Sequence, residues 1–255
     1  MMPTALVIQA RLASSRLPGK VLKPLAGTPM LFWQAARLCR ARRIDTVVFA
    51  ISEAASDDLL QKECEERGFL VARGPSDDLV GRVAAARRLA EAGRVVRVWG
   101  DSPFGCPDIL DAALAEMDAR KALFVATSRL GERGLTYGLD FEVYDGDVLD
   151  MLDRTLTDPV EREFPIEGAV RLLSRESIHL FAPAGVMTGA MLCVDYPEDL
   201  EAANRLAEAL LEQPDPHAHS ALISVLRSRP DLANRFAKAP RNVEYNAARI
   251  LKAVE

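Results

Sequence analysis

The residues best suited to chemistry follow the first predicted strand. An apolar run over residues 5–8 is typical of a buried strand, and the loop behind it gathers cations around a Pro-Gly turn. These cations are Arg11, Arg16, Lys20 and Lys23. Ammonium and guanidinium groups pair with phosphate oxygens, and the backbone N–H groups that Gly19 frees can complete an anion cradle. The loop therefore predicts a polyphosphate clamp.

This loop lacks two familiar phosphate-binding patterns. It contains neither the G-x-x-x-x-G-K-[ST] pattern of P-loop ATPases nor the G-x-G-x-x-G pattern of Rossmann dehydrogenases. A solvated basic loop is the alternative interpretation. The position behind a buried strand favours ligand binding, because α/β proteins bind ligands at the carboxyl ends of parallel strands.

Two aspartates stand at the ends of later strands. Asp101 follows the strand expected over residues 94–99, and Asp195 follows the strand expected over residues 191–194. A carboxylate at such a tip can hold Mg²⁺ beside phosphates. Taken singly, Asp101 could be a turn former and Asp195 the N-cap of the next helix. Together with the basic loop they indicate a metal–triphosphate site.

Three further groups give candidate contacts. Arg73-Gly74, after a short strand, could let a flat base approach closely, although an ordinary strand–helix turn with Asp77-Asp78 as a cap is the alternative. Asp140 and Glu142 share one face of a strand and could point at a substrate. The pairings within residues 158–163 are ambiguous, and the favoured interpretation of residues 161–163 is a solvated helix face. No Ser-His-Asp, Cys-His or metalloprotease pattern is apparent.

The elements that must position these groups alternate along the chain. Strands are expected at residues 5–10, 46–51, 70–72, 94–99 and 122–127. Helices are expected between them at residues 29–43, 56–67, 76–93 and 107–120. This alternation predicts an α/β fold with a mostly parallel sheet flanked by helices. Three strands should follow at 139–144, 178–182 and 191–194, and the chain should be mainly helical after residue 197.

Composition excludes several classes of protein. The 255 residues, 49% hydrophobic and 27% charged, suit one globular domain with a small extension. The net charge of −5 argues against a nucleic-acid partner. No apolar run approaches the ~20 residues of a membrane span, and no secretion signal is present. We therefore expect a cytoplasmic protein without a membrane partner, and its four widely spaced cysteines should be reduced.

Three segments, in this order, carry a resemblance to a known family. They are Gln9-Ala10-Arg11-x-x-Ser14-Ser15-Arg16-Leu17-Pro18-Gly19-Lys20, Gly100-Asp101-x-Pro103 and Val194-Asp195-x-Pro197-Glu198-Asp199-Leu200. With them the chain resembles the cytidylyltransferases that activate acidic sugars as CMP conjugates, a family that includes the CMP-Kdo and CMP-sialic acid synthetases. It is most similar to the spore coat polysaccharide biosynthesis protein F branch, which Arg73-Gly74 and Arg162-Glu163 also match.

The resemblance implies a nucleotide-diphospho-sugar transferase fold of the Rossmann-like type. We expect the nucleotidyltransferase domain over residues 1–201 and a helical C-terminal extension over residues 202–255 packed on it. The implied reaction transfers CMP from CTP to an acidic sugar of the nonulosonic or octulosonic type and releases pyrophosphate, in surface polysaccharide or glycan biosynthesis. Mg²⁺ is the implied cofactor, and relatives of this fold suggest a homodimer.

The resemblance also assigns roles by position. Catalysis would depend on Arg16, Lys20 and Asp101. The nucleotide would be bound by Gln9, Ala10, Arg11, Ser15, Lys20, Arg73, Gly74, Asp78 and Arg97. Asp101 and Asp195 would hold Mg²⁺, and the candidates for acceptor contacts are Asp140, Glu142 and Arg162.

Three positions depart from the usual pattern of the branch. Phe164 stands where a histidine is usual, the residues after Asp101 differ, and residues 191–194 lack the usual Arg and Thr. These departures concern the acceptor more than the nucleotide. Two alternatives therefore stay open: a nucleotidyltransferase that uses another nucleoside triphosphate or a non-sugar acceptor, and an inactive nucleotide-binding relative.

Overall fold

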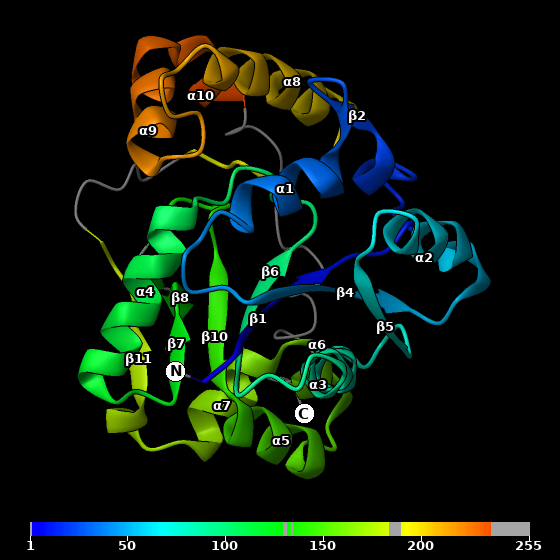
Figure 1. Ribbon diagram of the computed structural model, residues 1–255, viewed down its shortest axis with the longest axis vertical. Helices are drawn as coiled ribbons and strands as arrows, with labels where there is room; N and C mark the ends of the chain where they lie inside the picture. Colours follow the sequence, from blue (N-terminus) through cyan, green and yellow to red (C-terminus); the bar gives the residue numbers. More distant parts are fainter. Residues whose placement is uncertain (1, 130–131, 134, 184–189, 236–255) are drawn as a thin grey trace, which may run out of the picture.

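A seven-stranded sheet forms the centre of the computed structural model, which describes residues 2–129, 132–133, 135–183 and 190–235 (Figure 1). Its strand order is β11-β7-β10-β6-β1-β4-β5. The strands are β1 (Thr4–Gln9), β4 (Thr46–Ser52), β5 (Leu70–Gly74), β6 (Arg94–Trp99), β7 (Phe124–Ala126), β10 (Phe141–Asp145) and β11 (Ile178–Leu180). Only β10 runs antiparallel to its neighbours, so the predicted mostly parallel sheet is confirmed.

Helices cover both faces of this sheet. One face packs on α1 (Met30–Leu38), α2 (Asp58–Glu65) and α4 (Pro107–Arg120). The other face packs on α3 (Leu79–Leu89), α5 (Gly146–Thr155) and α7 (Pro165–Leu172). Successive side chains of a strand point to opposite faces, so Leu6 and Ile8 of β1 join the first core and Ala5 and Val7 join the second.

The C-terminal helices extend the first of these cores. They are α8 (Pro197–Leu211), α9 (His219–Ser228) and α10 (Pro230–Arg235). Fully buried side chains such as Leu206, Leu210 and Leu222 belong to the same apolar cluster as α1. The expected domain boundary at residue 201 falls within α8 and stays a prediction.

Short elements complete the fold. Two small hairpins pair β2 (Pro24–Leu25) with β3 (Thr28–Pro29), and β8 (Ser128–Arg129) with β9 (Glu132–Arg133). Helix α6 (Pro159–Glu163) precedes α7, and single 3₁₀ turns lie at Lys20–Leu22, Ala55–Asp57 and Arg175–Ser177.

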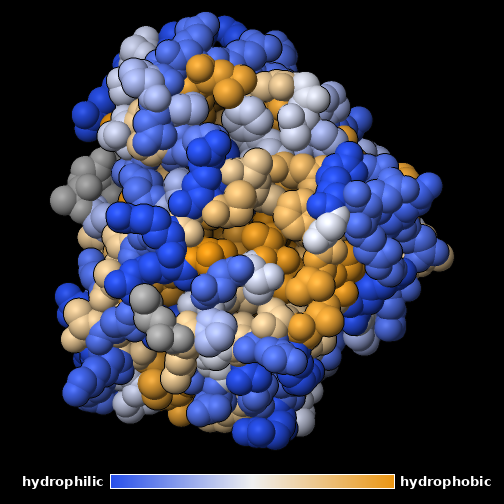
Figure 2. Space-filling view, in the orientation of Figure 1, coloured by the Kyte–Doolittle hydropathy of each residue, from blue (hydrophilic) through white to orange (hydrophobic). Residues whose placement is uncertain are grey.

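In Figure 2 hydrophilic side chains cover the outer surfaces of α2 and α5, while apolar side chains gather near the middle of this face.

Several predicted elements differ from the structure, among them the helix expected over residues 76–93, which spans only Leu79–Leu89. The helix expected to reach residue 43 ends at Leu38, because the backbone N–H groups of Arg42 and Arg43 donate to the carboxylate of Asp111 on α4. The strand expected over residues 191–194 is absent apart from one bridge between Met191 and Tyr137. Its N–H groups bond to loop carbonyls instead of to a neighbouring strand.

Two simpler expectations can be compared with the described residues. Cys64, Cys106 and Cys193 are buried, Cys39 is exposed, and none of the four forms a disulfide among the described residues. None of the helices over the described ranges combines the length and the apolar composition that crossing a membrane requires. The expected cytoplasmic location stays a prediction.

Candidate active site

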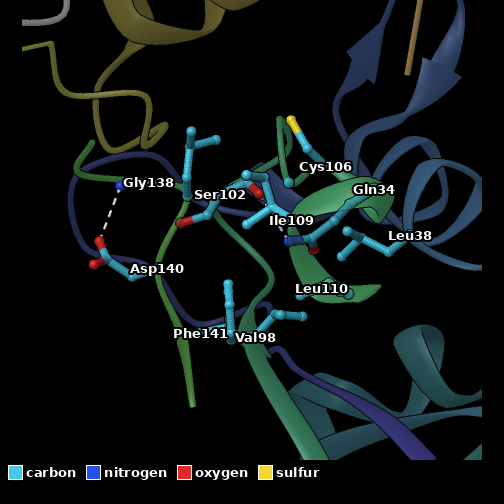
Figure 3. Close-up of a pocket in the computed structure, with 12 residues that line it drawn as sticks. Gln34, Leu38, Val98, Ser102, Cys106, Ile109, Leu110, Gly138, Asp140 and Phe141 are labelled. Carbon is cyan, nitrogen blue, oxygen red and sulfur yellow. Dashed lines mark hydrogen bonds between the residues drawn. The ribbon is translucent and has the colours of Figure 1, made fainter. Parts of the chain in front are cut away.

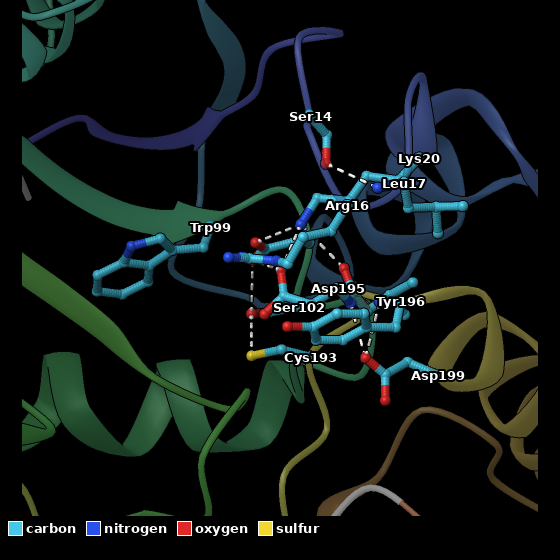
Figure 4. A network of polar contacts seen from close by, with 12 residues as sticks. Ser14, Arg16, Leu17, Lys20, Trp99, Ser102, Cys193, Asp195, Tyr196 and Asp199 are labelled. Carbon is cyan, nitrogen blue, oxygen red and sulfur yellow. Dashed lines mark hydrogen bonds and ion pairs between the residues drawn. The ribbon is translucent and has the colours of Figure 1, made fainter. Parts of the chain in front are cut away.

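Lys20 connects the basic loop to Asp101 and Asp195. Its ammonium donates to Asp101 Oδ2, to Asp195 Oδ1 and to the carbonyl of Val194, each at 2.9 Å (Figure 4). Arg16 Nη2 also lies 2.9 Å from Asp195 Oδ1, and the Arg16 guanidinium stands 5.6 Å from the centre of the Tyr196 ring. The structure thus brings together side chains from three segments that are far apart in the sequence.

Charge pairing keeps these groups ionised. Burial alone would lower the pKa of Lys20, which is only 8% exposed, but Asp101 and Asp195 outweigh it and raise that pKa. Burial alone would likewise raise the pKa of Asp195, but Lys20 and Arg16 lower it to about 2. Lys20 and Asp195 are therefore charged at neutral pH, and three acceptors use all three ammonium protons.

A tight turn at the end of β6 presents Asp101. Ser102 N–H donates to the carbonyl of Trp99 at 3.1 Å, and Gly100 N–H donates to the carbonyl of Gln9 at 2.8 Å. A Cβ atom on Gly100 would stand 2.8 Å from that same Gln9 oxygen, so only glycine fits there. Because Gln9 and Trp99 are level in the sheet, the ends of β1 and β6 reach the site together.

The start of α8 fixes Asp195. The carboxylate of Asp199 accepts hydrogen bonds from the N–H groups of Asp195 at 2.9 Å and Tyr196 at 3.0 Å. Val194 N–H donates to the carbonyl of Asp101 at 2.9 Å, which ties the two aspartate segments together. Asp199 was not among the predicted site residues. The signal for it was an acid two positions after a helix-starting proline, Pro197.

The two aspartates fit a magnesium ion. Mg²⁺ is usually held by one or two carboxylates together with waters and substrate phosphates. Asp101 and Asp195 already share one cation, the ammonium of Lys20, at 2.9 Å from an oxygen of each. Within the described ranges no group of three His, Cys, Asp or Glu side chains could hold a metal. A metal here would therefore need further oxygen ligands from phosphates and water.

Arg97 lies beside this site in a buried cluster. Its guanidinium donates to Glu142 Oε2 at 2.9 Å and to Gln9 Oε1 at 2.7 Å, and it covers the Trp99 ring at 4.1 Å from the centre. The hydroxyl of Tyr144 also donates to Glu142. Burial alone would lower the pKa of Arg97, but Glu142 outweighs it and raises that pKa. The structure therefore pairs a predicted nucleotide residue with a predicted acceptor residue.

The interpretation of residues 161–163 as a solvated face is wrong. Glu161 is only 7% exposed and pairs with Arg171 at 2.7 Å. Arg162 forms a two-pronged contact with Asp78, with both donor distances 2.8 Å. Glu163 Oε2 is buried and has no hydrogen-bond partner among the described residues. The short α6 lies against α3, so this face is covered by protein instead of water.

Glu163 is the second residue to which the sequence analysis gave no site role. Burial raises the pKa of its carboxyl, and the positive charges of Arg82, Arg11 and Arg97 oppose that shift. Arg82 is also buried, and its guanidinium donates to the carbonyl of Pro75. Charges from the β1 loop, β6, α3 and α6 therefore meet around the Glu163 carboxyl. The Arg162-Glu163 pair was visible in the sequence, but nothing marked it as buried.

Other predicted residues lie apart from the Lys20 cluster. Arg73 donates to the carbonyls of Ser52 and Ala54, each at 3.0 Å, and to side chains of α2. Gly74 ends β5, and its carbonyl accepts from Glu53 N–H. Asp78 caps α3 through Gly81 N–H at 2.9 Å. These contacts hold the β5 end of the sheet together.

The remaining predicted residues are placed as follows. Asp140 accepts from Thr127 Oγ1 and from the N–H of Gly138, each at 3.1 Å. Arg11 and Ser15 are exposed on the basic loop, whereas Ala10 is buried. Phe164 is the N-cap residue of α7 and is partly buried.

Comparison with known proteins finds relatives of this chain. The family model described as Cytidylyltransferase matches residues 5–218. The spore coat polysaccharide biosynthesis protein SpsF of Bacillus subtilis is 29% identical over 89% of this chain and 95% of its own. A 3-deoxy-manno-octulosonate cytidylyltransferase of Anaeromyxobacter dehalogenans is 36% identical over 45% of this chain and 47% of its own.

Solved structures show the same fold. A cytidylyltransferase from Leptospira borgpetersenii superposes with a TM-score of 0.81 at 24% identity and covers 94% of this chain and 99% of that one. A CMP:2-keto-3-deoxy-manno-octonic acid synthetase in complex with CTP superposes with a TM-score of 0.60 at 22% identity, covering 80% of this chain and 98% of that one. These neighbours confirm the expected Rossmann-like nucleotidyltransferase fold.

Proposed function

This chain belongs to the cytidylyltransferase family of nucleotidyltransferases, and from that premise we propose that it transfers CMP from CTP to an acidic sugar with release of pyrophosphate. The observation that carries the proposal is the convergence of Lys20 and Arg16 on Asp101 and Asp195. We propose a nonulosonic or octulosonic acid as acceptor, in surface polysaccharide or glycan synthesis. The Bacillus spore coat protein and the octulosonate cytidylyltransferases among its relatives support that class.

The reaction is an in-line displacement at the α-phosphorus of CTP. A hydroxyl oxygen of the acceptor forms the new bond to phosphorus, the bond to the bridging oxygen of the pyrophosphate breaks, and the hydroxyl proton leaves to solvent. Such chemistry depends on positioning and on charge neutralisation. Lys20 and Arg16 would stabilise the negative charge that grows on the leaving pyrophosphate. To do so, Lys20 must leave at least one of its three present acceptors.

Asp101 and Asp195 would hold Mg²⁺ beside the phosphates. The ion would polarise the α-phosphoryl oxygen and lower the pKa of the acceptor hydroxyl. In this proposal Lys20 exchanges carboxylate oxygens for phosphate oxygens as the nucleotide arrives, and so stays paired throughout. The low pKa of Asp195, about 2, supports a ligand that is ionised at neutral pH.

The other assignments differ in their support. Arg11 and Ser15 are exposed on the loop that holds Lys20, which favours phosphate contacts. Arg73 makes its hydrogen bonds within the chain, so its part in base binding would be to fix the strand end at Gly74. Asp140, Glu142 and Arg162 are proposed for the acceptor, and binding it would require each to exchange hydrogen bonds that it now makes within the chain. A homodimer is proposed from the family alone.

One assay tests the reaction. The protein is incubated with CTP, Mg²⁺ and a panel of nonulosonic and octulosonic acids, and pyrophosphate is followed. We expect release with at least one acid, and a loss of about 10²–10³ in rate for Asp101→Asn and for Asp195→Asn. Asp118→Asn, a carboxylate paired with Arg43 and Arg94, is the control.

Each other outcome would reject part of the proposal. Full turnover by Asp101→Asn would reject the metal assignment. Release with UTP or GTP but not with CTP would make the protein a transferase of another nucleotide. CTP binding without release on any acceptor would favour an inactive nucleotide-binding relative, and thermal shifts with each nucleotide separate that case from loss of binding.

A further inference from the structure

Gln34 of α1 forms hydrogen bonds with both ends of the turn that carries Asp101. Its side-chain nitrogen Nε2 donates to the carbonyl of Trp99 at 2.9 Å and to the carbonyl of Ser102 at 2.8 Å. These two carbonyls stand on either side of Gly100-Asp101. Figure 3 shows the amide nitrogen of Gln34 pointing toward the segment that holds Ser102. One amide group thereby links the two ends of the turn.

The surroundings fix the orientation of this amide. Gln34 is only 1% exposed, so its nitrogen cannot exchange the two carbonyls for bulk water. An amide turned the other way would set its oxygen against two carbonyl oxygens, and acceptors do not pair with one another. Gln34 Oε1 has no hydrogen-bond partner among the described residues. The amide nitrogen therefore faces the two carbonyls.

A small cavity lies beside this contact. It measures about 10 Å³ and is lined by Gln34, Ser102 and Asp140 among others. A volume of roughly 10–15 Å³ holds one water. The space is too small for a substrate, so ligand binding does not explain why a polar side chain is buried here.

A second residue of α1 supports the same segment. Arg37, one turn further along the helix, donates to the carbonyl of Gly105 at 3.2 Å. Residues three apart share a helix face, so Gln34 and Arg37 present one donor-bearing face to residues 99–105. Arg37 also donates to Pro216 and His217 carbonyls, which makes it a general support for the fold. Gln34 is specific to the turn.

We propose that Gln34 is a positioning residue that sets the place of the Asp101 carboxylate relative to Lys20 and Asp195. The inference rests on the proposed role of Asp101 as a metal ligand. Misplacement of a reacting group by about 1 Å can reduce a rate by about 10²-fold. Loss of the two donors would loosen the turn, although the backbone hydrogen bonds of Gly100 and Ser102 would remain.

The test replaces Gln34 with methionine, which has a similar length and no donor. We expect kcat to fall about 10-fold or more, with KM for CTP changed less than about threefold, because the nucleotide still meets the basic loop. Hydrogen exchange of the amides in residues 99–105 should increase. Gln34→Asn keeps an amide on a shorter side chain, so its kcat should fall less than that of Gln34→Met. It replaces Gln34→Met in the test if the methionine variant folds poorly.

Leu152→Ala is the matched control. Leu152 is fully buried on α5 in the opposite core, so this change lowers stability without touching the turn. A kcat of Gln34→Met within twofold of the unmodified protein would overturn the inference, and so would a loss no larger than that of Leu152→Ala. If the unmodified protein releases no pyrophosphate, the proposed function fails. In that case hydrogen exchange of the amides in residues 99–105 is the remaining test of the inference. An unchanged exchange rate in Gln34→Met overturns it.

Discussion

The carboxylate of Asp199 accepts a hydrogen bond of 2.9 Å from the backbone N–H of Asp195, so the first turn of α8 fixes the backbone of a proposed metal ligand. We predict that Asp199→Ala lowers the free energy of unfolding by about 0.5–2 kcal/mol, the usual effect of losing a helix cap. It should also reduce pyrophosphate release about 10-fold, because the Asp195 carboxylate is no longer held beside Lys20. Asp199→Asn keeps an acceptor oxygen and should recover most of the rate.

Asp145→Ala separates positioning from stability in this experiment. Asp145 caps α5 by accepting from Asp147 N–H at 3.0 Å, on a helix of the opposite core. Its loss should lower stability by a similar amount and leave the rate of pyrophosphate release unchanged. Equal losses of rate in Asp199→Ala and Asp145→Ala would contradict the prediction.

Removal of the shared ammonium should change metal binding in a characteristic direction. Lys20→Met leaves Asp101 and Asp195 together without their cation, so we predict tighter Mn²⁺ binding in the absence of nucleotide. The same variant should bind CTP more weakly and release pyrophosphate about 10²–10³-fold more slowly. Mn²⁺ binding is measured by electron paramagnetic resonance, which needs no turnover.

Lys23→Met is the control for the loss of one positive charge from the same loop. Lys23 contributes a backbone N–H to the carbonyl of Lys20, and that contact survives the substitution. Mn²⁺ affinity should be unchanged in this variant. If Lys20→Met binds Mn²⁺ no better than the unmodified protein, the two carboxylates do not form the site we assign.

The meeting of the basic loop with Asp101 was predictable from sheet topology. The strands that precede them, β1 and β6, are parallel neighbours, and parallel neighbours end at the same edge. Asp195 reached the site for a different reason. Residues 191–194 were expected as a strand because they are apolar, and Leu192 and Val194 are indeed fully buried. Their N–H groups donate to the carbonyls of Tyr137 and Asp101 instead of to a neighbouring strand. The apolar pattern therefore indicated burial but not strand pairing.

The pairing of charges with each other could not be predicted. Arg97 pairs with Glu142, 45 residues away, and Arg162 pairs with Asp78, 84 residues away. No local spacing encodes such contacts, because they depend on how β10 and α6 pack. A charged side chain near a strand end looks the same in sequence whether it faces a ligand or another charge. Resemblance to the family therefore assigned all four to ligands.

The Asp78–Arg162 contact should make stability depend on pH in the acid range. Burial alone would raise the pKa of Asp78, but the hydrogen bonds from Arg162 and Gly81 outweigh it and lower that pKa. A carboxyl whose pKa is lower in the folded state stabilises the fold above its unfolded pKa, and this contribution is lost as the pH falls through the folded value. Asp78→Asn keeps the cap on α3 and loses the charge.

We therefore predict that Asp78→Asn lowers the free energy of unfolding by about 1–2 kcal/mol at pH 7. The difference from the unmodified protein should be constant above about pH 5 and shrink as the pH falls below about 4. Urea unfolding across this range measures it, with the exposed neighbour in Asp77→Asn as control. A difference that grows toward low pH would contradict the assigned direction of the pKa shift.

The buried pair of Arg97 and Glu142 allows structural and binding roles to be separated. The two side chains are 3% and 5% exposed, so either single substitution leaves a buried charge without its partner. We predict that Arg97→Met lowers the free energy of unfolding by about 3–5 kcal/mol. The double variant Arg97→Met/Glu142→Gln should recover about 1–3 kcal/mol of that loss, measured as the coupling in a double-mutant cycle.

Calorimetric titration of these variants with CTP tests whether Arg97 also contacts the nucleotide. If Arg97 contacts the nucleotide, the double variant binds CTP more weakly than Glu142→Gln alone. Equal affinities would restrict Arg97 to holding Glu142, Gln9 and Trp99 in place.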